Sequence, residues 1–138
     1  MMIKKSPWIS FFNSGGCKGC GLECIVLTTP KYDIERFGCL MRPSARHADI
    51  LLVTGVMNKQ SKTRLKKVYE QMAPNKKVVA IGSCAISGGI FQDAYNASEG
   101  VDKEIPVDIY VPGCPPKPEA IINAIIKILK DFNGSKKN

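Results

Sequence analysis

The chain has 138 residues, and its 20 Lys and Arg against 12 Asp and Glu give a formal net charge of +8 at pH 7. This length predicts one domain, residues 1–134, followed by a basic tail, residues 135–138, that we expect to be flexible. A hydrophobic share of 44% excludes wholesale disorder, and no run approaches the ~20 apolar residues of a membrane span.

The amino terminus indicates where in the cell the chain works, and the charge indicates which kinds of partner it suits. No apolar run there is long enough for a secretory leader, which predicts a cytoplasmic chain whose thiols stay reduced. Metal or cluster ligation is then the leading role for at least some of the six cysteines. The basic charge suits a solvated surface, an acidic partner or lipid headgroups. We expect no nucleic-acid partner, because no interleaving of aromatic and basic residues accompanies the charge.

The first half of the chain predicts two buried strands, each a short apolar run bounded by turn-forming residues. They cover Trp8–Phe12 and Ile50–Thr54. Between them, Cys24 lies one turn after Cys20 on a segment that reads as helical. After the second strand Asn58 can cap a helix, and apolar residues then recur at helical spacing up to Ala73-Pro74: Leu65, Val68, Tyr69 and Met72.

The second half predicts two more strands, Lys77–Ile81 and Ile109–Val111, and a last helix that begins at Pro118 and ends near Gly134. The apolar surface of this helix is wider than a usual core-facing stripe, so part of it faces a partner subunit or the whole helix is deeply buried.

Strands that alternate with helices predict an α/β sandwich. Near-continuous apolar runs, rather than alternation of polar and apolar residues, favour a mostly parallel four-stranded sheet covered on both faces. In open sheets of this kind, sites form outside the carboxyl ends of the strands.

Four cysteines follow the ends of three predicted strands. Cys17 and Cys20 come after the first strand, Cys84 directly after the third, and Cys114 after the fourth. One sheet edge therefore gathers four thiolates from three turns that are rich in glycine, which allows backbone to approach an inorganic core. This pattern predicts one [4Fe–4S] cluster held by Cys17, Cys20, Cys84 and Cys114.

Other uses of the thiols stay open. Structural zinc also takes four cysteines but usually draws on two paired knuckles, and only Cys17 and Cys20 form a pair here. Cys24 could join that pair as a third ligand, which would leave the two later glycine-flanked cysteines unexplained. Cys39 reads as a small buried apolar residue.

The remaining polar residues do not form a catalytic centre of their own. His47 is the single histidine, and no nucleotide-binding loop is present. Glu23 beside the first pair is either a helix first-turn carboxylate or a group that carries protons or contacts a partner. Arg42 and Arg46 either offset the negative charge of a cluster or lie on the surface. We expect no catalytic residue in this chain.

Five segments in order, from about Trp8 to Lys130, resemble one family. They are GCKGCGLE (16–23), YDIERFG (32–38), RHADILLVTG (46–55), GSCA (82–85) and PGCPP (112–116). The chain resembles the small subunits of membrane-bound, energy-converting [NiFe] hydrogenases, kin to the 20 kDa-type cluster-bearing subunit of respiratory complex I.

The resemblance implies a flavodoxin-like three-layer sandwich with one [4Fe–4S] cluster, again on Cys17, Cys20, Cys84 and Cys114. It implies a non-catalytic subunit of an oxidoreductase complex, peripheral on the cytoplasmic side of the cell membrane. This subunit would relay electrons between a ferredoxin-like (polyferredoxin) subunit and the Ni–Fe site of a large subunit similar to the 49 kDa subunit of complex I. Membrane subunits would complete the complex. Glu23 matches an acidic position of the family near the cluster.

One local feature separates branches of this family. Quinone-reducing relatives typically carry adjacent cysteines where this chain has the spaced pair Cys17 and Cys20, which favours the hydrogenase branch. Sulfur-reducing membrane complexes share the spaced pair, so an equivalent subunit of a sulfur- or quinone-reducing complex is the alternative. A further alternative is an interaction module that a metal merely stabilises.

Overall fold

The computed structural model describes residues 7–97 and 100–134, and the tail expected at residues 135–138 lies outside them. Five parallel strands form one sheet in the order β2-β1-β3-β4-β5. Their bounds are β1 Trp8–Asn13, β2 Leu40–Met41, β3 Ile50–Thr54, β4 Lys77–Ile81 and β5 Ile109–Val111. This order is that of flavodoxin-like sheets, so the expected fold class is confirmed.

The prediction of four strands was wrong by one. The fifth strand, β2, has two residues and pairs with Trp8 and Ile9 at the sheet edge. Two residues are too few to show any hydrophobic period, so tertiary pairing rather than local sequence defines this strand.

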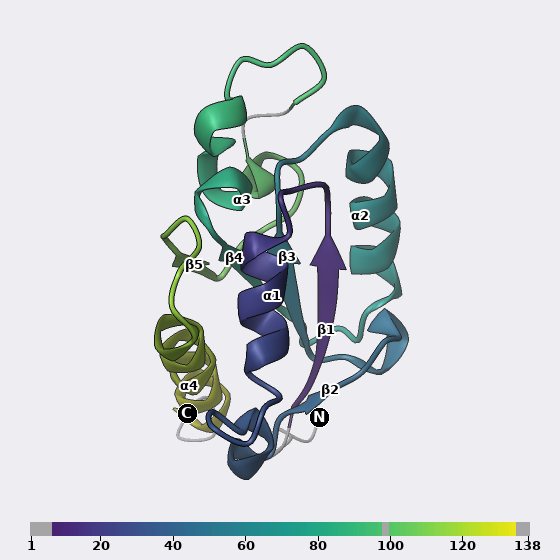
Figure 1. Ribbon diagram of the computed structural model, residues 1–138. Coiled ribbons are helices and arrows are strands. Elements are labelled where there is room, and N and C mark those ends of the chain that lie inside the picture. The colour runs from purple at the N-terminus through teal and green to yellow at the C-terminus, as the bar shows by residue number, and fades with distance from the viewer. Residues whose placement is uncertain (1–6, 98–99, 135–138) are drawn as a thin grey trace.

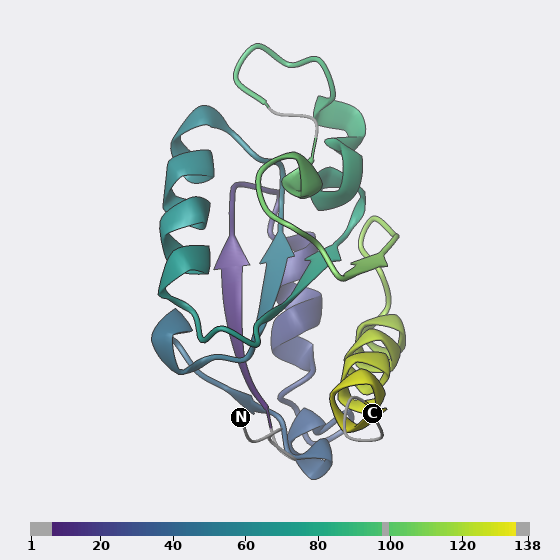
Figure 2. The ribbon, with the colours of Figure 1, turned by 180° about the vertical axis from the view of Figure 1, so that it is seen from behind.

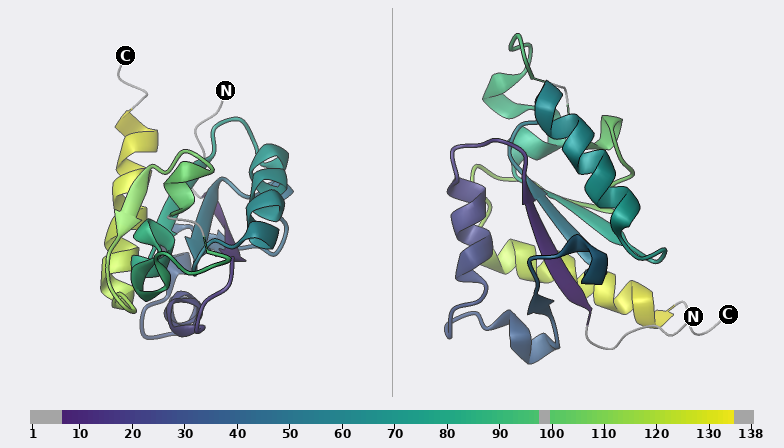
Figure 3. Two further views of the ribbon diagram at one scale, coloured as in Figure 1. Left: turned by 90° about the horizontal axis from the view of Figure 1, so that it is seen from above. Right: turned by 90° about the vertical axis from the view of Figure 1, so that its right-hand side faces the viewer.

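The described part of the chain also contains four α-helices and four 3₁₀ turns, all of which lie between strands except α4, which follows β5. The helices are α1 Gly19–Val26, α2 Lys59–Gln71, α3 Ser83–Ser87 and α4 Pro118–Gly134, and the turns are η1 Ile34–Phe37, η2 Ala45–His47, η3 Gly89–Phe91 and η4 Val101–Lys103. Helices α1 and α4 lie on one side of the sheet and α2 on the other (Figure 1; Figure 3, right). Seen from behind, α2 and the segment after α3 cover the second face (Figure 2).

Alternate residues of each central strand supply two separate cores. In β3, Ile50 and Leu52 pack towards α1 and α4, whereas Leu51 and Val53 pack towards α2 and α3. Both faces of the strand are therefore buried, which is why its sequence shows no alternation of polar and apolar residues.

The wide apolar surface of α4 is explained by burial. Ile121, Ile125 and Ile128 are at most 1% exposed, and Ile126 and Leu129 pack partly buried against the same core. Among the residues that the structure describes, no helix is both long enough and apolar enough to cross a membrane.

A candidate four-cysteine site

The parallel sheet brings the cysteine-bearing loops to one edge. Strands β1, β4 and β5 end at Asn13, Ile81 and Val111, and the loops with Cys17, Cys20, Cys84 and Cys114 follow these ends. Figure 3 (left) looks down on this edge, where α1 and α3 lie side by side. Parallel pairing alone therefore gathers segments that are far apart in sequence.

The four thiols are close enough to affect one another electrostatically. Burial raises the pKa of Cys20, and the negative charges of Cys84, Cys17 and Cys114 raise it further, against a smaller lowering by a backbone hydrogen bond. The pKa of Cys84 is also raised by burial and then by the charges of Cys114 and Cys17. The four cysteines singled out in the sequence are thus neighbours in the fold.

Glycine keeps the space beside two of the sulfur atoms open. A Cβ added to Gly82, whose φ is +87°, would lie 2.5 Å from the Sγ of Cys20. A Cβ on Gly89, at φ +54°, would lie 3.3 Å from the Sγ of Cys84. Any larger residue at Gly82 would displace the thiol, so the backbone approaches the site as closely as the sequence suggested.

Hydrogen bonds join the loop after β4 to the loop after β5. The Gly82 N–H donates to the Val111 carbonyl at 2.8 Å, and the Ser83 N–H donates to the Gly113 carbonyl at 2.9 Å. The Ser83 hydroxyl donates to the same Gly113 carbonyl at 3.2 Å. These bonds fix the segments that carry Cys84 and Cys114 relative to each other.

The spaced pair begins helix α1. Lys18 adopts a left-handed conformation with φ +69°, and its carbonyl accepts the Leu22 N–H at 2.9 Å, which starts the helix. A small pocket follows this turn and reaches the ends of β1 and β3, with Cys17, Cys20 and Cys84 in its lining.

The donor set suits an iron–sulfur cluster in number and chemistry. A [4Fe–4S] cluster takes four cysteine thiolates, one on each iron, so its ligands stand around a volume rather than a point. Cys17 and Cys114 are exposed and Cys20 and Cys84 partly buried, so the thiols frame a region at the protein surface. Within residues 7–97 and 100–134, no three His, Cys, Asp or Glu side chains are grouped so as to hold a metal ion.

The other two cysteines belong to the core. Cys24 is 1% exposed, and burial, followed by the charges of Cys20 and Glu23, raises its pKa to about 12. Cys39 is 0% exposed, and burial raises its pKa to about 11, which confirms that it is a buried apolar residue.

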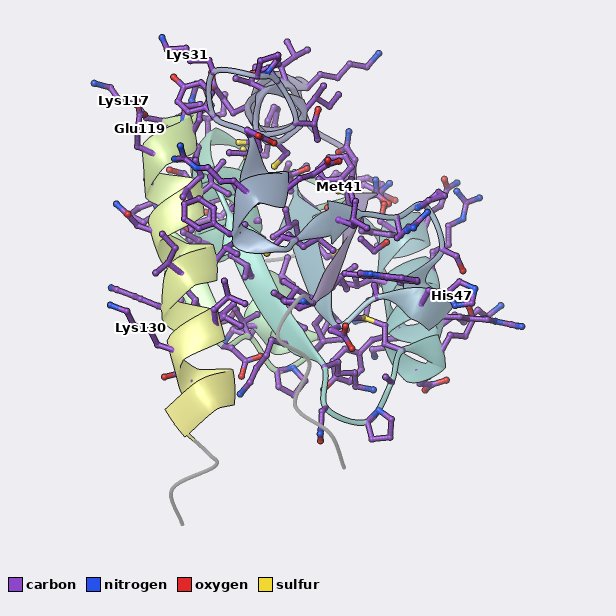
Figure 4. The ribbon with its side chains drawn as sticks, turned by 90° about the horizontal axis from the view of Figure 1, so that it is seen from below. Lys31, Met41, His47, Lys117, Glu119 and Lys130 are labelled. Carbon is purple, nitrogen blue, oxygen red and sulfur yellow. The ribbon has the colours of Figure 1, made fainter. Side chains whose placement is uncertain are left out.

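Arg42 lies away from the four candidate ligands. Its guanidinium stacks 4.6 Å from the ring centre of Trp8, where β1 begins, and the ring of His47 meets Trp8 edge-on. This is the opposite edge of the sheet, the side seen in Figure 4 with Met41 and His47 labelled. The position favours a surface role for Arg42 over charge compensation at the thiols.

Sequence reasoning missed the polar residues that support the site. Ser14 and Ser61 hold the loop before Cys17, and Glu104 pairs with two lysines of α2. Asn58 was expected only as a helix cap, which its 2.8 Å bond from the Ser61 N–H confirms. A hydroxyl or carboxylate in a loop carries no periodic signal, so these contacts need the fold.

Comparison with known proteins places the chain in a defined group. Residues 17–128 match the family model of the NADH ubiquinone oxidoreductase 20 kDa subunit. The chain is 49% identical over 128 residues to a probable membrane-bound hydrogenase subunit of Pyrococcus furiosus, across 93% of this chain and 77% of that protein. It is 43% identical over 135 residues to an NADH-quinone oxidoreductase subunit of Geotalea daltonii, across 98% and 76%.

Solved structures of oxidoreductase complexes contain chains with the same fold. A chain of the membrane-bound sulfane sulfur reductase, an archaeal respiratory membrane complex, superimposes with a TM-score of 0.81 at 46% identity, covering 95% of this chain and 72% of that one. A chain of an NAD⁺-reducing [NiFe]-hydrogenase shares the fold, with a TM-score of 0.69 at 20% identity over 91% and 92%. The named relatives are subunits of oxidoreductase complexes.

Proposed function

Because the chain belongs to the family of the complex I 20 kDa subunit and the [NiFe] hydrogenase small subunit, we propose that it is the electron-transfer subunit of a membrane-bound hydrogenase. Cys17, Cys20, Cys84 and Cys114 would hold one [4Fe–4S] cluster. When bound, such a cluster accepts and releases single electrons. The chain itself supplies the thiolates, the close backbone and the exposed rim.

The convergence of four thiols from three loops carries this proposal. The negative charges of the other three thiolates each raise the pKa of Cys20, although Cys114 lies almost a hundred positions further along the chain. Burial raises the pKa of Cys20 and Cys84, so both thiols are protonated at neutral pH in the absence of a counter-charge. Iron would replace those protons and supply that charge.

The partners follow from the same premise. A large subunit with a Ni–Fe site would cover the exposed rim around Cys17 and Cys114, a ferredoxin-like subunit would supply electrons, and membrane subunits would anchor the complex. The chain would sit peripherally on the cytoplasmic side of the membrane. Glu23, which is partly buried in α1 three residues after Cys20, would contact a partner or take part in proton transfer.

Purification under anaerobic conditions tests the cluster directly. We expect about four irons and four acid-labile sulfides per chain and an EPR signal on reduction. A sample with no iron and no sulfide would overturn the proposal and leave a metal-free or zinc-stabilised interaction module.

One observation favours a second candidate. The chain of the sulfane sulfur reductase complex shares 46% identity with this one, so a sulfur-reducing complex is also compatible with the fold and with the spaced cysteine pair. The large subunit that co-purifies decides between the two. Two pairs of Cys-x-x-Cys in that subunit indicate a Ni–Fe site, and their loss excludes hydrogenase activity.

A further inference from the structure

Helix α2 contacts the segments that carry two of the candidate ligands. Ser61 in its first turn donates a hydrogen bond to Ser14, in the loop before Cys17. Two lysines in its middle form ion pairs with Glu104, and the segment before Glu104 packs on α3, the helix that carries Cys84. We propose that α2 is a brace that fixes these two segments relative to each other, with Ser61 and Glu104 as its positioning residues. The inference rests on the proposed function in treating Cys17 and Cys84 as ligands.

On the first side, the brace meets the carbonyl of Ser14. The hydroxyl of Ser61 and the amide nitrogen of Asn58 both donate to this one oxygen, the latter at 3.4 Å. Ser14 is itself 3% exposed, and its hydroxyl donates to the carbonyls of Thr54 at 2.9 Å and Gly55 at 3.0 Å. Ser14 therefore ties β1 to both β3 and α2.

Only two residues, Gly15 and Gly16, separate Ser14 from Cys17. Neither has a side chain that could fix the backbone, so backbone hydrogen bonds position this stretch. The Gly15 N–H donates to Asn13 Oδ1 at 3.1 Å and its carbonyl accepts the Val56 N–H at 3.2 Å, and the bonds at Ser14 add to these. The approach is also close. A Cβ on Gly55, which has φ +84°, would lie 2.9 Å from the Gly16 nitrogen. A shift of Ser14 would be passed on to Cys17.

On the second side, the brace meets the carboxylate of Glu104. Lys62 and Lys66, one turn apart on α2, place their ammonium groups 2.9 Å and 3.1 Å from its two oxygens. The Glu104 side chain is only 7% exposed, whereas the Lys62 and Lys66 side chains are 43% and 49% exposed, so the carboxylate is shielded from water while both ammonium groups remain accessible to it.

The segment that leads to Glu104 presses directly on α3. A Cβ on Gly100 would lie 2.5 Å from the carbonyl oxygen of Ile86, so the two backbones are in close contact. Ile86 is two residues after Cys84 on the same helix. The ion pairs at Glu104 therefore link α2, through the segment from Gly100 to Glu104, to the helix that bears the second ligand.

Ser61→Ala and Glu104→Gln test the brace in the full-length protein as purified. Hydrogen exchange measures the position of the loops whether or not iron is present. Loss of the Ser61 hydroxyl should make the Ser14 amide, which bonds the Thr54 carbonyl at 2.9 Å, exchange about five-fold faster, the worth of one hydrogen bond. Glu104→Gln should have the same effect on the amides of α3. Exchange in the distant helix α4 should stay unchanged in both variants.

A spectroscopic readout separates positioning from simple stabilisation. In the iron-loaded protein, both variants should alter the EPR signal of the reduced state and release iron to a chelator faster, at a temperature where circular dichroism shows an intact fold. Ser61→Thr, which keeps the hydroxyl, should restore the native signal. Thr63→Ala and Glu70→Gln, at exposed positions of the same helix, are the matched controls and should match the native protein.

Two results would overturn the brace. One is native exchange in residues 13–17 and in α3 together with a native EPR signal. The other is faster exchange spread evenly over the whole chain, which would mean that the contacts only add global stability. A native protein without iron would instead refute the proposed function, and the exchange pattern would still decide whether α2 fixes the two loops.

Discussion

Gly82 combines two constraints in one residue, because its backbone has φ +87° and its α-carbon faces the Sγ of Cys20. We expect Gly82→Ala to lower the free energy of unfolding by about 1–3 kcal/mol, because its backbone conformation of φ +87° and ψ 157° is one that essentially only glycine adopts. The new methyl group would also push the Cys20 thiol away, so the iron content should fall further than the stability loss explains. Denaturant unfolding and iron analysis measure the two effects separately.

Gly21→Ala is the matched control for that variant. Gly21 lies inside α1, and an added Cβ would meet only the edge of the Phe11 ring at an ordinary distance of 3.4 Å. Alanine favours helix over glycine, so this change should leave the iron content intact and leave stability unchanged or slightly higher. Equal iron loss in both glycine variants would contradict the role assigned to Gly82.

Cysteine substitutions test the ligand assignment. Cys84→Ala should remove the cluster, because a [4Fe–4S] cluster needs its four thiolates. Cys39→Ala should keep full iron content, since Cys39 is fully buried in the core and burial is the only cause of its raised pKa, with no contribution from a neighbouring thiol. The change should cost about 1 kcal/mol through the small cavity it leaves. Iron and sulfide analysis of both variants is the measurement. Full iron content in Cys84→Ala would show that the ligand set is wrong.

At the scale of the elements, the ion pairs between α2 and Glu104, the residue after η4, predict that the stability of the fold depends on pH. Burial alone would raise the pKa of Glu104, but hydrogen bonds and charges from Lys62 and Lys66 outweigh it and hold the pKa below its ordinary value of 4.5. The stabilisation is therefore complete above that value and is lost as the pH falls through the lower pKa of the folded state.

Glu104→Gln makes this dependence measurable. At neutral pH the variant should be less stable than the native chain by about 1–2 kcal/mol, the worth of hydrogen bonds to a charged group. As the pH falls through the lowered pKa of the native carboxyl, the difference should shrink, because that carboxyl is then protonated as well. Urea unfolding at neutral pH and at a series of acidic pH values gives the comparison. A difference that stays constant with pH would show that the carboxylate charge contributes nothing.

Helix α4 contributes to stability through its buried face. Ile125 is 1% exposed, so Ile125→Ala should lower the free energy of unfolding by about 2–5 kcal/mol. Asn123→Ala, two residues earlier at an exposed position, should change it by less than about 0.5 kcal/mol. Thermal or denaturant unfolding measures both. A small effect at Ile125 would mean that the helix is held elsewhere.

The elements differ in how far sequence predicts them. Strands β3, β4 and β5 were predicted to the residue, because each is a short apolar run between turn-forming residues. Strand β2 and helix α3 were missed, because two and five residues are too short to repeat a hydrophobic period. The burial of α4 was left open, because width of the apolar face alone does not say what covers it.

At the scale of the whole molecule, the candidate site was predictable because parallel strands end at a common edge. The carboxyl ends of parallel strands share one edge whatever the strand order, so four cysteines could be assigned to one place from their positions after strands. The residues that position the cysteine-bearing loops were not predictable in this way. Ser61 and Glu104 act across the fold, and only the packing of α2 shows which loops they meet.

The sheet order also sets the sequence in which the site can be completed during synthesis. Strand β5 is the outer strand next to β4, and the loop after it supplies Cys114. Most of the chain must therefore leave the ribosome before the fourth thiol is available. A nascent or truncated chain that stops before β5 should fail to retain iron, so metal loading is expected to follow the synthesis of the β5 segment.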